Sequence, residues 1–499
     1  MAHKSVVIVG GGIAGLAAGC YARMNGYPAT ILEMHDIPGG LCTAWKRKGY
    51  TFDISMHMVT GSKSGAFHTM WQELGALDGR RFVYHSELGR LESRGKVLEF
   101  VTDRRRIEQQ MLALSPADAR LIRELLDLLF GRSLLAAASL TPAELSGPLD
   151  SLRMLVAFAP FLPAFVRYRR QTVQEFAERF QDPFLRQAVR FIIDAPGWPM
   201  PRFPMFALAG FIPGAVAESG VPVGGSQQVV LAIAERFRRL GGELRCKTRV
   251  EDVVVRNDRA VGVRLADGSE VSGDTVVWAG DGHTLIFDLL QGRYVNDAIR
   301  RMYDTWTPVR PLVHVALGVA RDMSAEPRGV SFELERPITI AGEERRWLQV
   351  IHHSFDPTMA PPGKAAVEVW YPCRFDYWQE LARDRDRYKA EKKSIADLTV
   401  AELDKRWPGF AAQVEVVDVP TPATYARYTG NWQGSPDGWY ITPDNMKSTP
   451  VHTLPGLADL YMAGQWTAPF TGTVIAALSA RQAIQLLCKQ DRMPFRTTT

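Results

Sequence analysis

The chain has 499 residues, of which 46% are hydrophobic and 23% charged, and it contains no low-complexity tract, so a disordered or fibrous protein is excluded. The net charge of +5 comes from 59 basic and 54 acidic residues, an excess too small to indicate a nucleic-acid partner. The five cysteines are far apart and form no CxxC pair, which favours a reducing, cytoplasmic compartment and no structural zinc. We therefore expect no metal and no nucleic acid, and the oligomeric state is left open.

The first thirty-five residues predict a strand, a tight turn, a helix and a second strand. VVIV is a short β-branched run suited to a buried parallel strand, and a GxGxxG sequence follows it directly. Its glycines allow a tight turn, the approach of a pyrophosphate to the backbone, and close helix–strand packing. Glu33 ends the second strand, at the spacing expected for an acid that binds ribose hydroxyls, so NADP is not expected here. The nucleotide contacts are predicted at Gly10, Gly12, Ile13, Ala14, Gly15 and Glu33.

A second glycine pair follows where a simple nicotinamide enzyme would continue into another helix. The sequence HDIPGG places Gly39 and Gly40 shortly after the ribose-binding acid. Backbone N–H groups at such a pair can approach a second phosphate or a ribityl chain. The pair therefore favours a long cofactor lying extended across the domain, namely FAD, over an ordinary Gly-Gly turn. No second dinucleotide fingerprint is found, so a built-in NADPH domain is not expected.

The motifs together resemble a known family. GxGxxG, the acid, and then GG…GYxFDxxxH over Gly39–His57 are similar to the phytoene desaturase-like flavoproteins, which include carotenoid desaturases, carotenoid isomerases and retinol saturases. That group belongs to the amine-oxidase-like flavoprotein superfamily. The resemblance continues over Val221–Val255 and Asp459–Cys488, and RYTGNWQGSPDGW, residues 427–439, resembles the isomerases and saturases.

The resemblance implies further cofactor contacts. It places the backbone of Val250 against the adenine and the segment around Gly464 against the flavin. The further positions are Leu41, Met56, Val250, Gly464, Gln465, Thr473 and Val474. Two positions depart from the family pattern: Leu41 stands where an arginine is common, and Gln465 where an aspartate is common. Lys46 or Arg47 is a candidate to supply the missing positive charge, and an amide can still bond ribityl or phosphate oxygens.

Two residues are candidates for catalytic roles. His57 is expected near the edge of the isoalloxazine, where an imidazole can exchange a proton near neutral pH. The alternative is a hydrogen-bonded histidine with no chemical role. Trp466 is expected at the flavin face, where it could stack on substrate or cofactor, and its alternative is a packing tryptophan. His352 and His353 are strand neighbours that would face opposite sides, so a metal pair is not expected there.

The fold class predicted is α/β: a discontinuous Rossmann-type FAD domain with an α+β substrate domain built from insertions. The FAD domain is expected over 1–75, 221–290 and 450–490, and the substrate domain over 76–220 and 291–449. EDVVVRNDRAVGVRLADGSEVSGDTVVWAGD, within the FAD domain, predicts a three-stranded meander with turns at Asn257-Asp258 and Asp267-Gly268.

Two apolar, proline-containing stretches stand out in the insertions, Arg153–Arg170 and Trp198–Ala217. Their prolines and short apolar runs argue against a membrane-spanning helix. Three interpretations stay open: core helices, the wall of a lipophilic tunnel, or contact with a membrane surface through the apolar side chains and Arg167, Arg169 and Arg170. The last would make a cytoplasmic protein peripheral on the membrane.

The function predicted is an FAD-dependent desaturase, saturase or redox-neutral isomerase acting on the double bonds of a hydrophobic polyene or isoprenoid lipid, such as a carotenoid or retinoid. The alternative enzyme is a flavin amine oxidase, and the alternative outside enzymes is a flavin-bearing lipid carrier. The sequence does not indicate the direction of the reaction or the electron acceptor.

Overall fold

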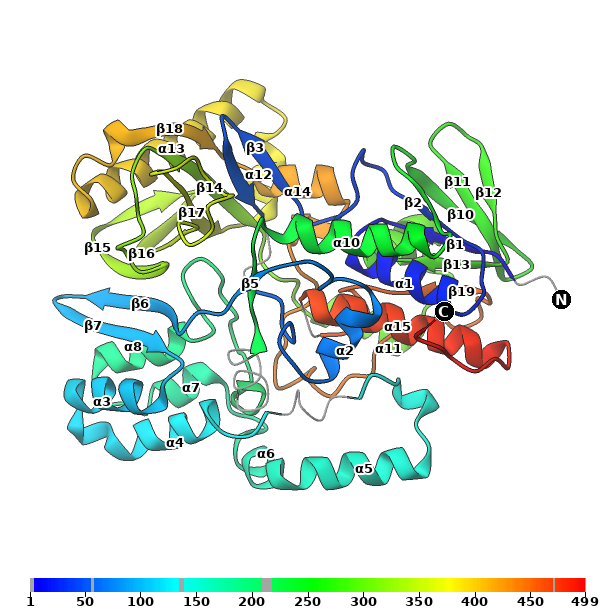
Figure 1. The fold of residues 1–499 in the computed structure, drawn as a ribbon, viewed down its shortest axis with the longest axis horizontal. Helices are drawn as coiled ribbons and strands as arrows, with labels where there is room; N and C mark the ends of the chain where they lie inside the picture. The colour runs from blue at the N-terminus through cyan, green and yellow to red at the C-terminus, as the bar shows by residue number, and fades with distance from the viewer. Residues whose placement is uncertain (1–3, 55–57, 134–138, 209–217, 470–471, 499) are drawn as a thin grey trace.

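The computed structural model describes residues 4–54, 58–133, 139–208, 218–469 and 472–498. Within these ranges, a five-stranded parallel sheet and a seven-stranded mixed sheet organise two halves of the molecule, on the right and left of Figure 1. All five cysteines are free.

The parallel sheet confirms the predicted Rossmann-type arrangement. Its strand order is β19-β13-β1-β2-β9, and every neighbouring pair is parallel. Both faces of β1 are buried, which explains why its sequence is apolar without alternation. The strands are β1 (Val6–Val9), β2 (Ala29–Leu32), β9 (Glu243–Arg245), β13 (Thr275–Trp278) and β19 (Leu460–Met462).

Three helices pack around this sheet: α1 (Ile13–Met24), α10 (Ser226–Arg239) and α15 (Thr473–Gln490). Small residues let them approach closely. A Cβ added at Gly19 of α1 would lie 2.8 Å from both the Ile31 side chain of β2 and the Phe237 ring of α10. The small residues that follow the glycine motif are therefore a packing requirement of this layer.

An antiparallel meander lies beside the parallel sheet and bears out the predicted turns. Its strands are β10 (Val250–Arg256), β11 (Arg259–Leu265) and β12 (Glu270–Ser272). Asn257 and Asp258 link the first two strands with φ of +50° and +54°, as a tight two-residue hairpin turn requires.

The seven-stranded sheet has the order β18-β14-β17-β16-β15-β6-β7 and is antiparallel except between β15 and β6. Its strands all come from 76–220 and 291–449, and those of the parallel sheet all come from 1–75, 221–290 and 450–490. Its central strands β14 and β17 are buried at every residue. The strands are β6 (Glu87–Ser93), β7 (Lys96–Val101), β14 (Leu312–Val319), β15 (Gly329–Ile340), β16 (Glu343–His352), β17 (Ala365–Pro372) and β18 (Val414–Asp418).

A short hairpin joins the two halves. It consists of β3 (Ala44–Arg47) and β4 (Tyr50–Asp53), and a Cβ added at Gly318 of β14 would lie 2.6 Å from the Tyr50 ring. The Tyr50 hydroxyl donates to Glu415 Oε2 at 2.6 Å. A second short pair, β5 (Phe82–Val83) with β8 (Val221–Pro222), marks the return of the chain to the parallel sheet.

Helices of the insertions form two groups, one beside β6 and β7 and one beside β18 (Figure 1). The first group is α3 (Arg104–Leu114), α4 (Ala119–Leu129), α7 (Val173–Ala177) and α8 (Pro183–Phe191). The second is α12 (Phe375–Leu381), α13 (Arg385–Arg406) and α14 (Pro422–Thr429). Two further helices, α2 (Ala66–Glu73) and α11 (Asp297–Thr305), lie near α15 in the view.

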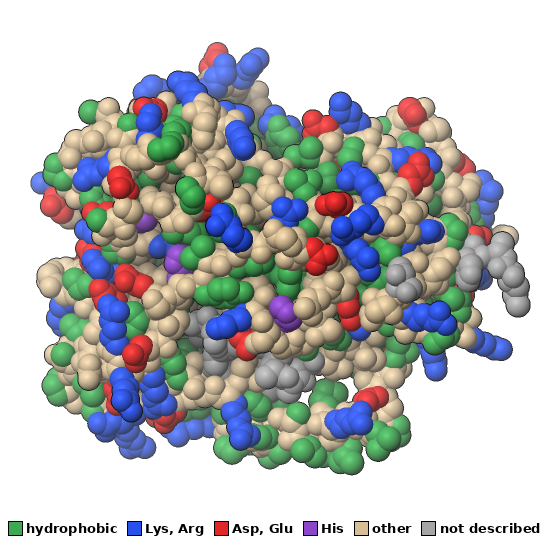
Figure 2. Space-filling model, viewed as in Figure 1, with side chains coloured by type: hydrophobic (Ala, Val, Ile, Leu, Met, Phe, Trp, Pro, Cys, Tyr) green, Lys and Arg blue, Asp and Glu red, His purple; other side chains and the backbone are tan. Residues whose placement is uncertain are grey.

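The stretch expected to be broken by proline is instead helical. α5 (Pro148–Phe158), a short 3-10 turn and α6 (Leu162–Tyr168) follow one another along the lower edge of Figure 1. Over Pro148–Tyr168 they are long and apolar enough to cross a membrane by length and composition, although only 6% of the apolar window is buried. The expectation that no helix spans a membrane stays a prediction, because this criterion concerns length and composition alone. Figure 2 shows hydrophobic side chains along this lower rim.

Candidate cofactor site

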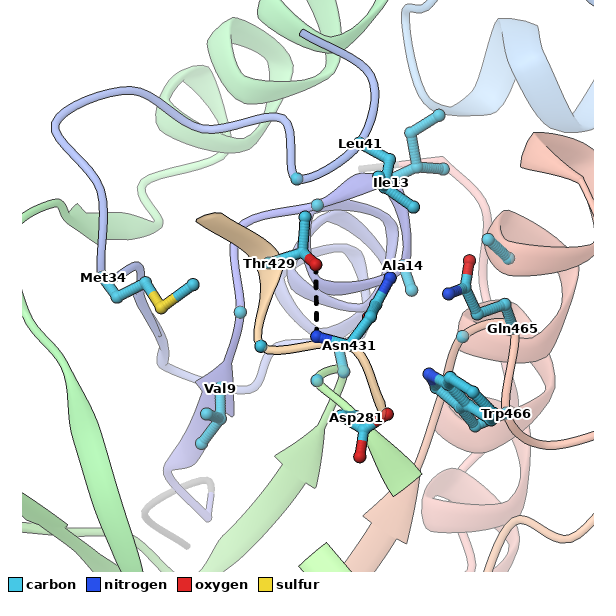
Figure 3. Close-up of a pocket in the computed structure, with 18 of the residues that line it drawn as sticks. Val9, Ile13, Ala14, Met34, Leu41, Asp281, Thr429, Asn431, Gln465 and Trp466 are labelled. Carbon is cyan, nitrogen blue, oxygen red and sulfur yellow. Dashed lines mark hydrogen bonds between the residues drawn. The ribbon is translucent and has the colours of Figure 1, made fainter. Parts of the chain in front are cut away.

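A cavity of about 540 Å³ lies at the carboxyl ends of the parallel strands, where open α/β sheets bind ligands. Figure 3 shows part of its wall. The predicted positions that line it are Gly10, Gly12, Ile13, Ala14, Glu33, Gly39, Gly40, Leu41, Val250, Gly464, Gln465, Trp466 and Thr473. Met56 and His57 lie outside the described residues, so their roles stay predictions.

The first glycine motif leaves space in front of α1. Gly10 has φ of +99°, and a Cβ added at Gly15 would lie 1.8 Å from the Gly10 carbonyl oxygen. A Cβ added at Gly12 would meet nothing nearer than 3.9 Å. Gly15 is therefore required for packing and does not line the cavity, whereas Gly12 borders open space at a helix N-terminus suited to a pyrophosphate.

Glu33 lies at the end of β2 and is 5% exposed. Its Oε2 accepts from the N–H of Gly11 at 2.6 Å, and its Oε1 accepts from the N–H of His35 at 2.8 Å. These bonds fix the carboxylate beside the glycine turn. It borders the cavity where an acid can accept hydrogen bonds from ribose hydroxyls.

The second glycine pair lies directly against the first motif. The Gly39 N–H donates to the Gly11 carbonyl oxygen at 3.0 Å, and Gly12 and Gly39 form a parallel bridge. Both Gly39 and Gly40 have positive φ, and a Cβ at Gly39 would lie 2.7 Å from the Cys42 carbonyl oxygen. The pair therefore extends the candidate nucleotide site past the position expected for the pyrophosphate. A long cofactor such as FAD requires this extra length.

The suggested replacement for the family's arginine is wrong. Lys46 and Arg47 lie in β3 and do not border the cavity, and Arg47 Nε lies 3.6 Å from Asp418 Oδ2 at the surface. Arg249 is the basic side chain among the lining residues that the structure describes. It directly precedes Val250, the first residue of β10, at the end of the cavity that Glu33 borders.

The other end of the cavity is formed by the C-terminal segment. Gly464 has φ of +109°, and its N–H donates to Ser479 Oγ at 2.7 Å. Gln465 and Trp466 follow it (Figure 3), and Thr473 begins α15. Val474, by contrast, is buried in the core against α1 and does not line the cavity.

Trp466 lines the cavity and is also packed in the core. Its side chain borders the cavity but is only 2% exposed, and its ring packs edge-to-face on Trp439 with centroids 5.2 Å apart. This packing fixes the orientation of the indole. A contact between Trp466 and a bound substrate stays a prediction.

Sequence reasoning missed one wall of the cavity. The last turn of α14 and the loop after it line the cavity through Tyr428, Thr429, Gly430, Asn431, Pro436 and Asp437. These residues all lie in the RYTGNWQGSPDGW segment, whose resemblance to the isomerases and saturases was the available signal. Trp198, Thr248, Trp278 and Thr284 are further lining residues that were not assigned.

Asp281, at the end of β13, ties this wall to the parallel sheet. Its Oδ2 accepts from the Trp432 N–H at 2.8 Å, and its Oδ1 accepts from the Thr284 N–H at 2.7 Å. Burial raises the pKa of the Asp281 carboxyl, and these two backbone hydrogen bonds oppose that rise. Within the described ranges, no group of three His, Cys, Asp or Glu side chains could hold a metal ion.

The residues fit FAD on structural grounds. Open space at Gly12, a fixed acid at Glu33 and a cavity lined from Val250 to Thr473 match the needs of one extended dinucleotide for phosphate space, a ribose acceptor and a long pocket. A nicotinamide dinucleotide would not explain the second glycine pair. The cavity also has the backbone-rich walls that allow close approach of phosphates and ribityl oxygens.

Comparisons with known proteins agree with this cofactor. The family described as flavin containing amine oxidoreductase matches residues 13–485. A lycopene-forming phytoene desaturase from Pseudescherichia vulneris is 26% identical, covering 97% of this chain and 99% of that protein. A chloroplastic prolycopene isomerase from Daucus carota is 25% identical, covering 95% of this chain and 78% of that protein.

The fold is shared with solved oxidoreductase structures. An oxidoreductase from Methanosarcina mazei has a TM-score of 0.64 at 16% identity, covering 96% of this chain and all of that one. The resemblance noted in the sequence is confirmed. The chain therefore belongs to the flavin-containing amine oxidoreductase family and is an FAD-dependent oxidoreductase of the phytoene desaturase-like type.

Proposed function

We propose that this enzyme oxidises, reduces or isomerises the conjugated double bonds of a hydrophobic polyene such as a carotenoid. The observation that carries the proposal is similarity over nearly the whole chain to proteins named as phytoene desaturases and prolycopene isomerases. Because the similarity includes both insertions, it extends to the half of the molecule expected to bind substrate.

The chain's own residues position the cofactor and exclude water. Gly12 and Gly40 admit phosphates and ribityl oxygens, and Glu33 accepts from ribose hydroxyls. Bound FAD supplies a centre that can accept or return a hydride. Trp466, held by Trp439, provides an apolar surface at the flavin end, and His57 remains the proposed proton donor or acceptor.

A membrane surface is the proposed source of this substrate. Seven large apolar side chains on α5 and α6 are at least half exposed, and no described element covers them. Arg153, Arg169 and Arg170 are exposed on the same segment and can meet anionic head groups. The apolar residues are Leu149, Leu152, Met154, Leu155, Val156, Leu162 and Val166.

One residue of the expected basic cluster has a different partner. Arg167 donates to Glu124 Oε1 at 2.8 Å, and Tyr168 donates to the same oxygen at 2.7 Å. Arg167 therefore holds α6 against α4. The proposed membrane contact relies on the two arginines that follow α6 and on the apolar face.

Product analysis tests the proposed reaction. Purified protein loaded with FAD is incubated anaerobically with vesicles containing phytoene or prolycopene, with and without a chemical reductant, and the extracted polyenes are separated by chromatography. The proposal expects a change in bond number or geometry that requires FAD. An amine oxidase would leave both polyenes unchanged and would instead oxidise an amine substrate, and a lipid carrier would extract the polyene unchanged.

A further inference from the structure

The last turn of α14 crosses the nucleotide cavity, and we propose that its contact with His35 is a gate that controls FAD exchange. The inference concerns the entry and release of the cofactor. It stands independently of which substrate the enzyme uses.

The gate contact joins residues far apart in the sequence. His35 lies two positions after Glu33, and its Nε2 is 2.6 Å from the carbonyl oxygen of Tyr428. A carbonyl oxygen only accepts, so Nε2 carries the proton. The two rings are also stacked, with centroids 5.0 Å apart and an interplanar angle of 26°.

The end of α14 explains why this contact forms. The last carbonyl groups of a helix lack N–H partners from their own helix. Gly430, with φ of +68°, ends α14, and the N–H of Trp432 turns away to Asp281. His35 therefore supplies the donor that the Tyr428 carbonyl would otherwise lack, at the end of the helix dipole that favours a proton donor.

We call residues 428–437 the strap. It is fixed to the FAD-binding half at three places: His35 after β2, Asp281 at the end of β13, and Gly472 before α15, whose N–H donates to Asp437 Oδ1 at 3.2 Å. In Figure 3, Thr429 and Asn431 of the strap lie between Met34 on the left and Gln465 and Trp466 on the right.

The three attachments differ in exposure. The carboxylates of Asp281 and Asp437 are buried, whereas the His35–Tyr428 contact is exposed to solvent. Because the strap and the start of α1 both line the cavity, a cofactor held between them displaces the strap as it enters or leaves. Because exposed hydrogen bonds open at lower cost than buried ones, opening begins at His35.

A gate and a direct cofactor contact have different kinetic consequences. Weakening a gate that is closed in both free and loaded protein speeds FAD binding and FAD release together. Weakening a direct contact speeds release alone. The two rates, measured by the fluorescence of free FAD, therefore separate the gate from an ordinary binding residue.

The test compares variants at His35 with a control at its exposed neighbour. His35→Ala removes both donor and ring, His35→Phe keeps the ring, and His35→Gln keeps a donor. Asp36→Asn is the control, because Asp36 is exposed beside His35 and does not line the cavity. We expect His35→Ala to raise both rates roughly three- to tenfold, with intermediate values for the other His35 variants and no change for Asp36→Asn.

Two outcomes would overturn the proposal that this contact is a gate. Unchanged rates in His35→Ala would show that the contact does not limit exchange. Faster release with unchanged binding would show that His35 contacts FAD directly. Circular dichroism and the absorption spectrum of bound FAD confirm that each variant is folded and loaded, and no measurement depends on turnover.

Discussion

The hydroxyl of Ser226 donates to the carboxylate of Asp53 at 2.6 Å, and the Ser226 N–H donates to the same carboxylate. Asp53 ends β4 in the GYTFD sequence, and Ser226 begins α10 in the VGGSQQ sequence. The two segments that resemble the flavoprotein family are therefore joined by one buried carboxylate at a helix N-terminus, where negative charge is favourable.

Asp53→Ala is expected to destabilise the protein by about 1–3 kcal/mol, because it leaves the N–H and hydroxyl of Ser226 without this acceptor. Thermal unfolding of the FAD-loaded protein measures the loss. Ser226→Ala removes the hydroxyl alone and should cost less. Equal stability of Asp53→Ala and the wild type would contradict a structural role for this carboxylate.

Gly12→Val is expected to abolish FAD binding while leaving the protein folded. The added side chain enters the open space in front of α1, since a Cβ there meets no atom nearer than 3.9 Å. The ratio of flavin to protein absorbance measures cofactor content, and circular dichroism measures folding. A folded Gly12→Val protein with a full complement of FAD would contradict the site.

Gly15→Ala is the matched control for that variant. Its Cβ would lie 1.8 Å from the Gly10 carbonyl oxygen, so the β1–α1 turn must shift. We expect this change to lower the unfolding temperature as well as cofactor content. Comparing the two variants therefore separates a loss of cofactor binding from a loss of folding stability.

Removing apolar surface from α5 is expected to weaken vesicle binding. The double variant Leu155→Asn with Val156→Asn replaces side chains that are 66% and 65% exposed, so folding should be unaffected. Sedimentation with anionic vesicles should show at least about tenfold weaker binding, given the transfer free energy of two such side chains. Val97→Asn, on β7, is the control. Unchanged vesicle binding by the α5 variant would exclude this face as the membrane contact.

The lowered pKa of His85 predicts that the folded protein loses stability in mild acid. Burial, with the nearby positive charges of Arg328 and His352, lowers its pKa to about 4. The folded protein therefore keeps His85 neutral while the unfolded chain takes up a proton below pH 6.5, so stability falls as the pH drops from 6.5 towards 4. His85→Gln should lose less stability across this window in chemical unfolding, and an equal loss would assign the effect to other groups.

Local sequence was enough to predict the first part of the site. Gly10, Gly12 and Glu33 lie in or directly after one strand–helix–strand unit, where spacing fixes geometry, and Gly39 follows it closely. The strap could not be predicted in this way, because the contact between His35 and Tyr428 joins residues 393 positions apart and depends on how α14 packs.

The α5–α6 segment is helical despite its prolines for a local reason. Pro148, Pro160 and Pro163 each fall in the first turn of a separate helical piece, where a missing N–H costs nothing. Counting prolines along the apolar run therefore predicted a break where three pieces follow end to end. Exposure of that segment could be read only from the structure.

An anaerobic absorption spectrum of the FAD-loaded enzyme tests the central claim most directly. Vesicles carrying a polyene are added to the oxidised enzyme, and separately to the enzyme after chemical reduction. The account predicts that the oxidised flavin band bleaches as the polyene is desaturated, or that the reduced enzyme saturates or isomerises the polyene. A flavin that stays unchanged with unaltered polyene in both states, but bleaches with an amine, would contradict it.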